Sequence, residues 1–173
     1  MTRHTLIKAM RPSLARTIAT LLLTTAWTSP ALAEGRSQVA GPRLQGEPNC
    51  RFAAPEGWRD HAVRWEGGCV NGKASGPGVL RAYAKHKPTE FFYGRLVDGT
   101  PRLGVLEQPD GFVAGEFDQG GAVQSDDRDV AVRALREAAQ AAKLASVRFK
   151  DKGNEASARF YLGKAEQLDA QLD

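Results

Sequence analysis

Residues 65–80, WEGGCVNGKASGPGVL, contain a near match to a phosphate-binding loop, because G-x-x-x-x-G-K runs from Gly67 to Lys73. A nucleotide site needs Ser or Thr after the lysine to hold magnesium, and its loop must open a helix whose amides face the phosphate. Ala74 occupies the hydroxyl position, and Gly-Pro-Gly at 76–78 opposes the start of a helix. The pattern therefore predicts a turn between two strands and no bound nucleotide.

The other residues with chemical potential lack the companions that a reaction or a metal would need. His61 and His86 are isolated, and we interpret both as surface histidines. The acidic run at 126–129 lacks the oxygen-rich loop and closing glutamate of a calcium site, so helix capping explains it. Lys-His-Lys at 85–87 is interpreted as a solvated loop tip, with a phosphate or anionic-lipid contact as the alternative. We expect no catalytic residue, metal or cofactor, and hence no enzyme.

The first 33 residues have the order of a secretory signal peptide. A basic start without acidic residues precedes an apolar run at 18–27, and Ala-Leu-Ala at 31–33 provides the small-residue stop. We predict cleavage after Ala33 and export, with a bacterial periplasm as the compartment that fits best. An uncleaved anchor is the alternative, although about ten apolar residues are fewer than the roughly 20 that span a bilayer.

Removal of this segment changes the charge of the chain. Four of the 24 Lys and Arg residues lie in it and none of the 20 Asp and Glu residues does, which leaves 20 of each sign. A neutral chain gives no indication of nucleic acid as a partner. Cys50 and Cys69 lie in the exported part, where two thiols are expected to form a disulfide. A metal pair is the alternative, but it lacks C-x-x-C spacing and a nearby histidine.

Composition divides the exported part into three segments. Residues 34–49 are Gly, Pro and polar residues without periodicity, so they predict a flexible leader. Residues 50–124 are rich in glycine, with aromatic and β-branched residues in short runs. Residues 125–173 lack proline and are rich in alanine, and apolar residues at helical spacing predict two helices with a break at 151–154. These helices are expected to pack on each other or on the preceding sheet, and a coiled-coil seam is the alternative.

One glycine motif occurs three times in the middle segment. Residues 67–72, 94–99 and 115–120 each read G-x-x-x-[NDQ]-G, and aromatic residues precede each first glycine. Such intervals indicate a repeat architecture. Asn-Gly and Asp-Gly are preferred in two-residue hairpin turns because both positions need a positive φ. The predicted turn residues are Asn71, Gly72, Asp98, Gly99, Gln119 and Gly120. The aromatics of successive hairpins are expected to stack over the glycine gaps of the sheet.

The repeats resemble the MORN family, whose units read approximately Y-x-G-x-x-x-N-G-x-x-x-G-x-G. Residues 65–78 match with Trp in place of Tyr, whereas the second copy has Leu103 and Val105 where the late glycines belong. The third copy keeps the front half only. The fold that follows is α+β: a short antiparallel sheet of MORN-like β-hairpins, followed by a C-terminal α-helical pair. The resemblance implies a scaffold that contacts proteins, with lipid contact proposed for some arrays.

We therefore expect an exported, non-enzymatic binding protein with an unidentified protein partner. The expected contact residues are Trp65, Phe92, Tyr93 and Phe112, and the alternative is that these aromatics form the core. Two other function classes remain: an inhibitor or immunity-type protein that blocks an enzyme through a loop at 100–110, and a cell-envelope hydrolase for which no catalytic residue is nominated.

Overall fold

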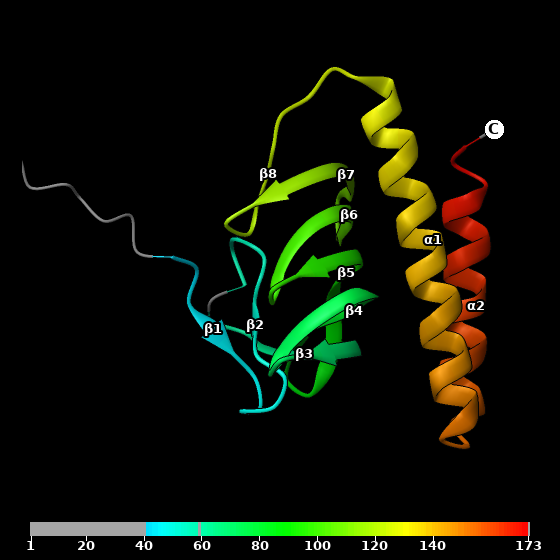
Figure 1. The fold of residues 1–173 in the computed structure, drawn as a ribbon. Helices are drawn as coiled ribbons and strands as arrows, with labels where there is room; N and C mark the ends of the chain where they lie inside the picture. Colours follow the sequence, from blue (N-terminus) through cyan, green and yellow to red (C-terminus); the bar gives the residue numbers. More distant parts are fainter. Residues whose placement is uncertain (1–40, 59, 173) are drawn as a thin grey trace, which may run out of the picture. The chain divides into compact units, whose positions relative to one another are not determined.

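A computed structural model describes residues 41–58 and 60–172 of the chain. The signal peptide predicted at 1–33 and the first part of the leader predicted at 34–49 lie outside these residues. The elements are β1 (Leu44–Gln45), β2 (Phe52–Ala53), β3 (Ala62–Val70), β4 (Lys73–Ala84), β5 (Lys87–Val97), β6 (Thr100–Gln108), β7 (Gly111–Asp118), β8 (Gly121–Ala122), α1 (Arg128–Asp151) and α2 (Glu155–Asp169). The predicted α+β fold, an antiparallel sheet followed by two helices, is confirmed (Figure 1).

The main sheet is a six-stranded antiparallel meander in which β3 to β8 follow each other in chain order. Three of its hairpins turn at the repeated motif. The residue before each turn glycine has positive φ, at 50° for Asn71, 50° for Asp98 and 49° for Gln119. The glycines follow at 74°, 81° and 94°. Since β3, β5 and β7 run in the same direction, the three turns lie at one end of the sheet.

One glycine from each of five neighbouring strands forms a row of register partners across the sheet. The row is Gly67, Gly78, Gly94, Gly104 and Gly115. A Cβ atom at Gly78 would lie 2.5 Å from the indole of Trp65. A Cβ atom at Gly104 would lie 2.9 Å from the ring of Phe92. Each ring thus covers the glycine gap of its own hairpin and not that of the next one, because residues two apart on a strand share a face.

The second repeat keeps this geometry although its late glycine is displaced in the sequence. A bulge beside Gly67 leaves two residues of β4 without register partners on β3, whereas the bulge beside Arg95 leaves one residue of β6 without a partner on β5. The shorter bulge moves the pairing by one residue, so Gly104 takes the place that Gly78 has in the first hairpin. The degenerate copy is therefore equivalent in space.

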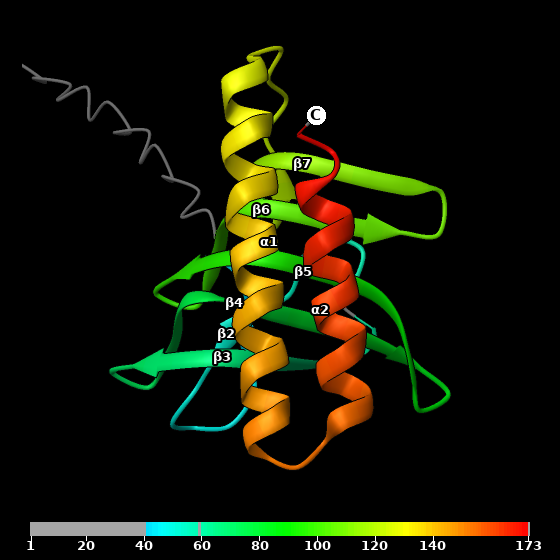
Figure 2. The same cartoon turned by 90° about the vertical axis from the view of Figure 1, so that its right-hand side faces the viewer.

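The two helices cover one face of the sheet and lie side by side across its strands (Figure 2). The Asp127 side chain caps α1 by accepting a hydrogen bond from the backbone N–H of Asp129, and Asn154 caps α2 in the same way from Ser157. Gly153 between them has φ of 73°. The apolar side of α1 is largely alanine, which allows the helix axis to approach both α2 and the sheet closely; its buried alanines are Ala134, Ala138, Ala139, Ala141, Ala142 and Ala145.

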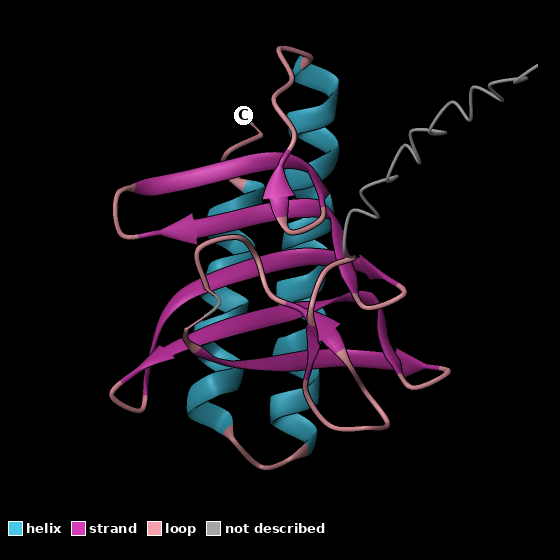
Figure 3. Ribbon diagram, turned by 90° about the vertical axis from the view of Figure 1, so that its left-hand side faces the viewer, coloured by secondary structure: helices cyan, strands magenta, loops and turns pink. Residues whose placement is uncertain are grey.

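The other face of the sheet is covered by the chain that precedes β3 (Figure 3). Within it, residues 51–56, called the strap below, cross the ends of the repeated hairpins. The backbone N–H groups of Arg51, Ala53 and Glu56 donate to the carbonyl oxygens of the three turn glycines, at 2.9, 2.7 and 2.7 Å. The acceptors are Gly72, Gly99 and Gly120 in that order. Each repeat therefore presents one turn carbonyl to the same segment.

The strap and the residues just after it also bring apolar side chains onto the sheet. Phe52 of the strap and Trp58 beyond it are 3% and 1% exposed and pack with Leu80, Phe92 and other buried residues of this face. The indole N–H of Trp58 donates to Glu90 at 2.7 Å. Within the described part of the leader predicted at 34–49, Leu44–Gln45 pairs with Phe52–Ala53 as a short antiparallel ladder.

Candidate functional site

The disulfide joins the beginning of the strap to the end of β3. Cys50 and Cys69 form the bond with their Cα atoms 5.4 Å apart, as predicted for this pair. The backbone N–H of Cys50 donates to the carbonyl oxygen of Glu47 at 2.9 Å, so the residues before the strap form a turn beside β3. The covalent link therefore fixes this turn against the first strand of the sheet.

A hollow of about 580 Å³ lies beside β3, between this strand and the turn that carries Cys50. Five consecutive residues of β3, Val63 to Gly67, contribute to its lining together with Phe52 and Arg81. Successive side chains of a strand point to opposite faces of a sheet. The lining therefore includes residues of both faces of β3, which places the hollow along this strand.

This edge is open among the residues that the structure describes. β3 is nine residues long, stands first in the strand order and pairs only with β4. The other edge of the sheet ends in β8, which has two residues. A long edge strand presents a row of unpaired backbone N–H and C=O groups to which another extended chain can pair. β3 carries no lysine or proline, two residues that often protect such an edge, although it does contain the charged Arg64 and Glu66 and the bulge beside Gly67.

The four aromatics predicted as a contact surface do not lie together. Phe92 and Tyr93 are fully buried on opposite faces of β5, so their prediction as contact residues is wrong and they belong to the core. Phe112 is 38% exposed on β7 and lies away from the hollow. Trp65 is partly buried over the glycine row and lines the hollow, with its indole N–H donating to the Gly68 carbonyl at 3.0 Å.

Positive charge surrounds the side of the hollow that faces the helices. Glu66 accepts from Lys152, the residue that follows α1, at 2.7 Å and lies 3.8 Å from the guanidinium of Arg81. The Arg64 guanidinium lies 5.3 Å from the ring centroid of Tyr83, and no carboxylate of the described residues pairs with it. One carboxylate thus faces three cationic side chains, which leaves this side of β3 with an excess of positive charge.

The helices are held on the sheet by a second polar cluster. Glu107 of β6 accepts from Lys164 of α2 at 2.5 Å and from the Tyr93 hydroxyl at 3.2 Å. Burial, with the negative charge of Glu107 adding to it, raises the pKa of Tyr93 far above its usual range. Burial likewise raises the pKa of Tyr161 to about 12, against the opposing charge of Arg81. Both phenols therefore stay neutral in the folded chain, and this cluster serves packing.

The remaining candidates do not assemble into a site. Residues 67–73 form the end of β3, its turn and the start of β4, without a helix start at Lys73. His61 is half-buried before β3, and His86 is exposed in the turn between β4 and β5. The loop expected at 100–110 is instead the central strand β6 and the beginning of a tight turn, so it offers no inhibitory loop.

No group of three or more His, Cys, Asp or Glu side chains with metal-binding geometry occurs in the described part of the chain. A second hollow, of about 600 Å³, lies between residues 41–45 and the end of the strap, but no aromatic side chain lines it. None of the helices within residues 41–172 has the length and apolar character needed to cross a bilayer.

Sequence analysis did not identify the strap or the open edge. The sequence contains one sign of the strap that can be recognised once the structure is known. The three turn glycines, at intervals of 27 and 21 residues, offer three equivalent carbonyl groups to one segment. The scan against protein-family models finds no matching family, and searches of the curated proteins and of the solved structures find no match. The resemblance to MORN repeats therefore stays a hypothesis.

Proposed function

We propose that this chain is an exported, non-enzymatic binding protein, built on MORN-like hairpins, that binds an extended segment of a partner protein along the edge of β3. The observation that carries the proposal is the nine-residue edge strand, which has no outer partner among the described residues and lies beside a hollow lined by residues of both its faces. In strand addition, main-chain hydrogen bonds supply affinity, and pockets for alternate side chains supply specificity. Export to the bacterial periplasm accounts for the disulfide.

A partner strand fits this edge better than a second copy of the chain does. Glu66 is the single carboxylate within β3, and it is already neutralised by Lys152 and Arg81. Antiparallel pairing of two β3 strands would therefore bring the Arg64 side chains of both copies to one interface without an acidic counterpart. A protein partner can supply that counterpart.

The test uses random peptides displayed on phage and selected against the disulfide-intact chain. Selected peptides are then synthesised with backbone N-methyl groups at either the odd or the even positions. In an added strand, alternate N–H groups face the neighbouring strand, so one methylated form should lose binding and the other should keep it. Amide hydrogen exchange should slow in β3 on binding.

Several outcomes would overturn the proposal. They are selection of no peptide above background, equal loss of binding for both methylated forms, and protection confined to the outer faces of α1 and α2. Light scattering measures the mass of the free protein, and so tests whether two copies of the chain pair along β3. A dimer that the selected peptides dissociate would make β3 a self-association edge instead.

A further inference from the structure

We infer that the segment bound along β3 alternates carboxylate and apolar side chains, with the carboxylates on the side of the sheet that carries the helices. This inference rests on the proposed function and specifies the chemistry of its partner. Consecutive residues of β3 contribute to the two walls of the hollow. The inference follows because one wall is cationic and the other is largely apolar.

The wall on the helix side is cationic. Arg64 is exposed and is held over the Tyr83 ring, and the Nε group of Arg81 is buried without a hydrogen-bond partner among the described residues. Glu66 is already satisfied by Lys152 at 2.7 Å. Cross-strand neighbours have Cβ atoms about 5 Å apart, so a carboxylate opposite or diagonal to Arg64 comes within reach of its guanidinium.

The cationic wall continues past the first residue of β3. Ala62 is the register partner of Tyr83, the turn between β4 and β5 follows with Lys85 and His86, and Lys87 begins β5. This turn is exposed, and Lys85 and His86 both have positive φ, at 48° and 70°, which holds these side chains at the tip although neither is glycine. An acidic segment that extends beyond β3 would meet further positive charge there.

The opposite wall is largely apolar. Val63 and Trp65 project from β3, Phe52 projects from the strap, and the disulfide closes the end of the hollow, while the turn that carries Cys50 adds Glu47 and Asn49 to the lining. An apolar side chain on this side would be removed from water against Val63, Trp65 and Phe52. An added strand places its side chains alternately on the two walls. The same register therefore requires carboxylates at every second position and apolar side chains between them.

The experiment compares two short peptides by titration calorimetry. One alternates glutamate with valine, and the other alternates lysine with valine. The glutamate peptide should bind, and the lysine peptide should bind at least about tenfold more weakly, as expected for the loss of a hydrogen bond between charged groups. Binding of the glutamate peptide to the unmodified chain should weaken as salt is raised, because exposed charge pairs are screened.

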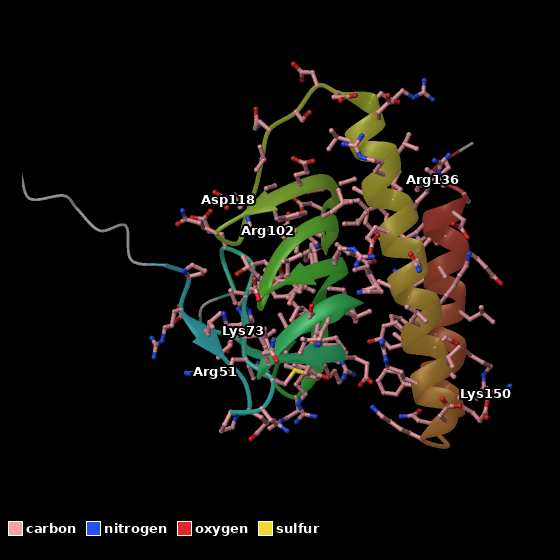
Figure 4. All side chains as sticks on the ribbon, in the orientation of Figure 1. Arg51, Lys73, Arg102, Asp118, Arg136 and Lys150 are labelled. Carbon is pink, nitrogen blue, oxygen red and sulfur yellow. A yellow bond between two sulfur atoms is a disulfide. The ribbon has the colours of Figure 1, made fainter. Side chains whose placement is uncertain are left out.

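Charge-reversed variants provide the specific test. Arg64→Glu should weaken binding of the glutamate peptide about tenfold and strengthen binding of the lysine peptide. Arg136→Glu is the matched control, since Arg136 is an exposed arginine on α1, toward the end of the helix that lies away from Lys150 (Figure 4). It should leave both affinities unchanged, and the unfolding midpoint of each variant shows that the chain remains folded.

Three results would overturn the inference. They are failure of both peptides to bind at millimolar concentration, equal affinity for the two peptides, and equal weakening by Arg64→Glu and Arg136→Glu. Failure of this inference can be told apart from failure of the proposed function. If phage-selected peptides pass the N-methyl test without carrying carboxylates, strand addition at β3 stands and the acidic partner is excluded.

Discussion

The contact between the strap and the repeated turns is tested most directly at Gly99, the turn glycine between β5 and β6. Its N–H donates to Ala74 at 2.8 Å, and its carbonyl accepts from the Ala53 N–H at 2.7 Å. A Cβ atom added here would lie 2.7 Å from the Arg51 carbonyl oxygen and 3.4 Å from the Cα atom of Phe52. Gly99→Ala therefore forces the strap away from the turn.

The expected cost has two parts. Gly99 has φ of 81°, and a residue with a Cβ atom pays about 1–2 kcal/mol in this region. Displacement of the strap breaks the hydrogen bond from Ala53, and an unsatisfied buried group costs about 1–3 kcal/mol. The free energy of unfolding should therefore fall by about 2–5 kcal/mol. Gly57→Ala is the matched control, because Gly57 has φ of 90° but no atom within 4 Å of the added Cβ. It should lose about 1–2 kcal/mol from the backbone alone.

The assay is urea denaturation of both variants with the disulfide intact, followed by far-ultraviolet circular dichroism. The difference between the two losses measures the contact with the strap. Gly163→Ala serves as a second reference, since Gly163 lies in α2 with open space around it, and this change should stabilise the chain by roughly 0.5–1 kcal/mol. Equal losses for Gly99→Ala and Gly57→Ala would refute the view that the strap is seated on the turns.

Three further predictions concern the disulfide, the core and the buried phenols. Replacing Cys50 and Cys69 by serine should lower the free energy of unfolding by about 3 kcal/mol on the chain-entropy model, and reductant should then shift the urea midpoint of the parent but not of the variant. Phe92→Ala should lower the free energy of unfolding by about 3–5 kcal/mol because the ring is fully buried. Phe112→Ala should lower it by under about 1 kcal/mol because that ring is 38% exposed. Similar urea midpoints for the two variants would contradict this prediction. The pKa of Tyr161 is raised to about 12 in the folded chain, so the phenol of the unfolded chain loses its proton at lower pH. The free energy of unfolding should therefore fall as pH rises from about 10 to about 12, by roughly 1.4 kcal/mol per pH unit for each such phenol. Tyr161→Phe should make this fall shallower, and an unchanged slope in alkaline urea titrations would count against it.

Local chemistry explains why the hairpins and helices could be predicted from the sequence. An Asn-Gly or Asp-Gly pair specifies its turn through the φ values that those two residues tolerate, without reference to the rest of the chain. Helix caps such as Asp127 and Asn154 also act over two or three residues. Apolar residues in 135–149 recur at steps of three and four residues. Because a helix repeats every 3.6 residues, this spacing identifies the buried side of α1.

The errors concern contacts between residues distant in the chain. The sequence shows that Phe92 and Tyr93 are aromatic, but burial of both requires the strap on one face of β5 and two helices on the other. Residues 100–110 contain Gly and Pro at loop-like frequency, yet Pro101 is fully buried in β6 beside the turn, where it is the register partner of Leu96 in β5 and has no partner in β7. The open edge of β3 is also a property of the assembled sheet, since no local pattern states which strand will lack a neighbour.

The strap explains why that edge stays open. The residues that precede β3 in the chain are the nearest candidates to pair with its free side. Their N–H groups at Arg51, Ala53 and Glu56 are instead bonded to turn carbonyls of three successive hairpins, so this segment runs across the strand ends and cannot also run along β3. The repeats therefore do more than build the sheet. By offering one carbonyl each at the same end, they hold the covering segment on the turns, which leaves the first strand of the meander without an outer neighbour among the described residues.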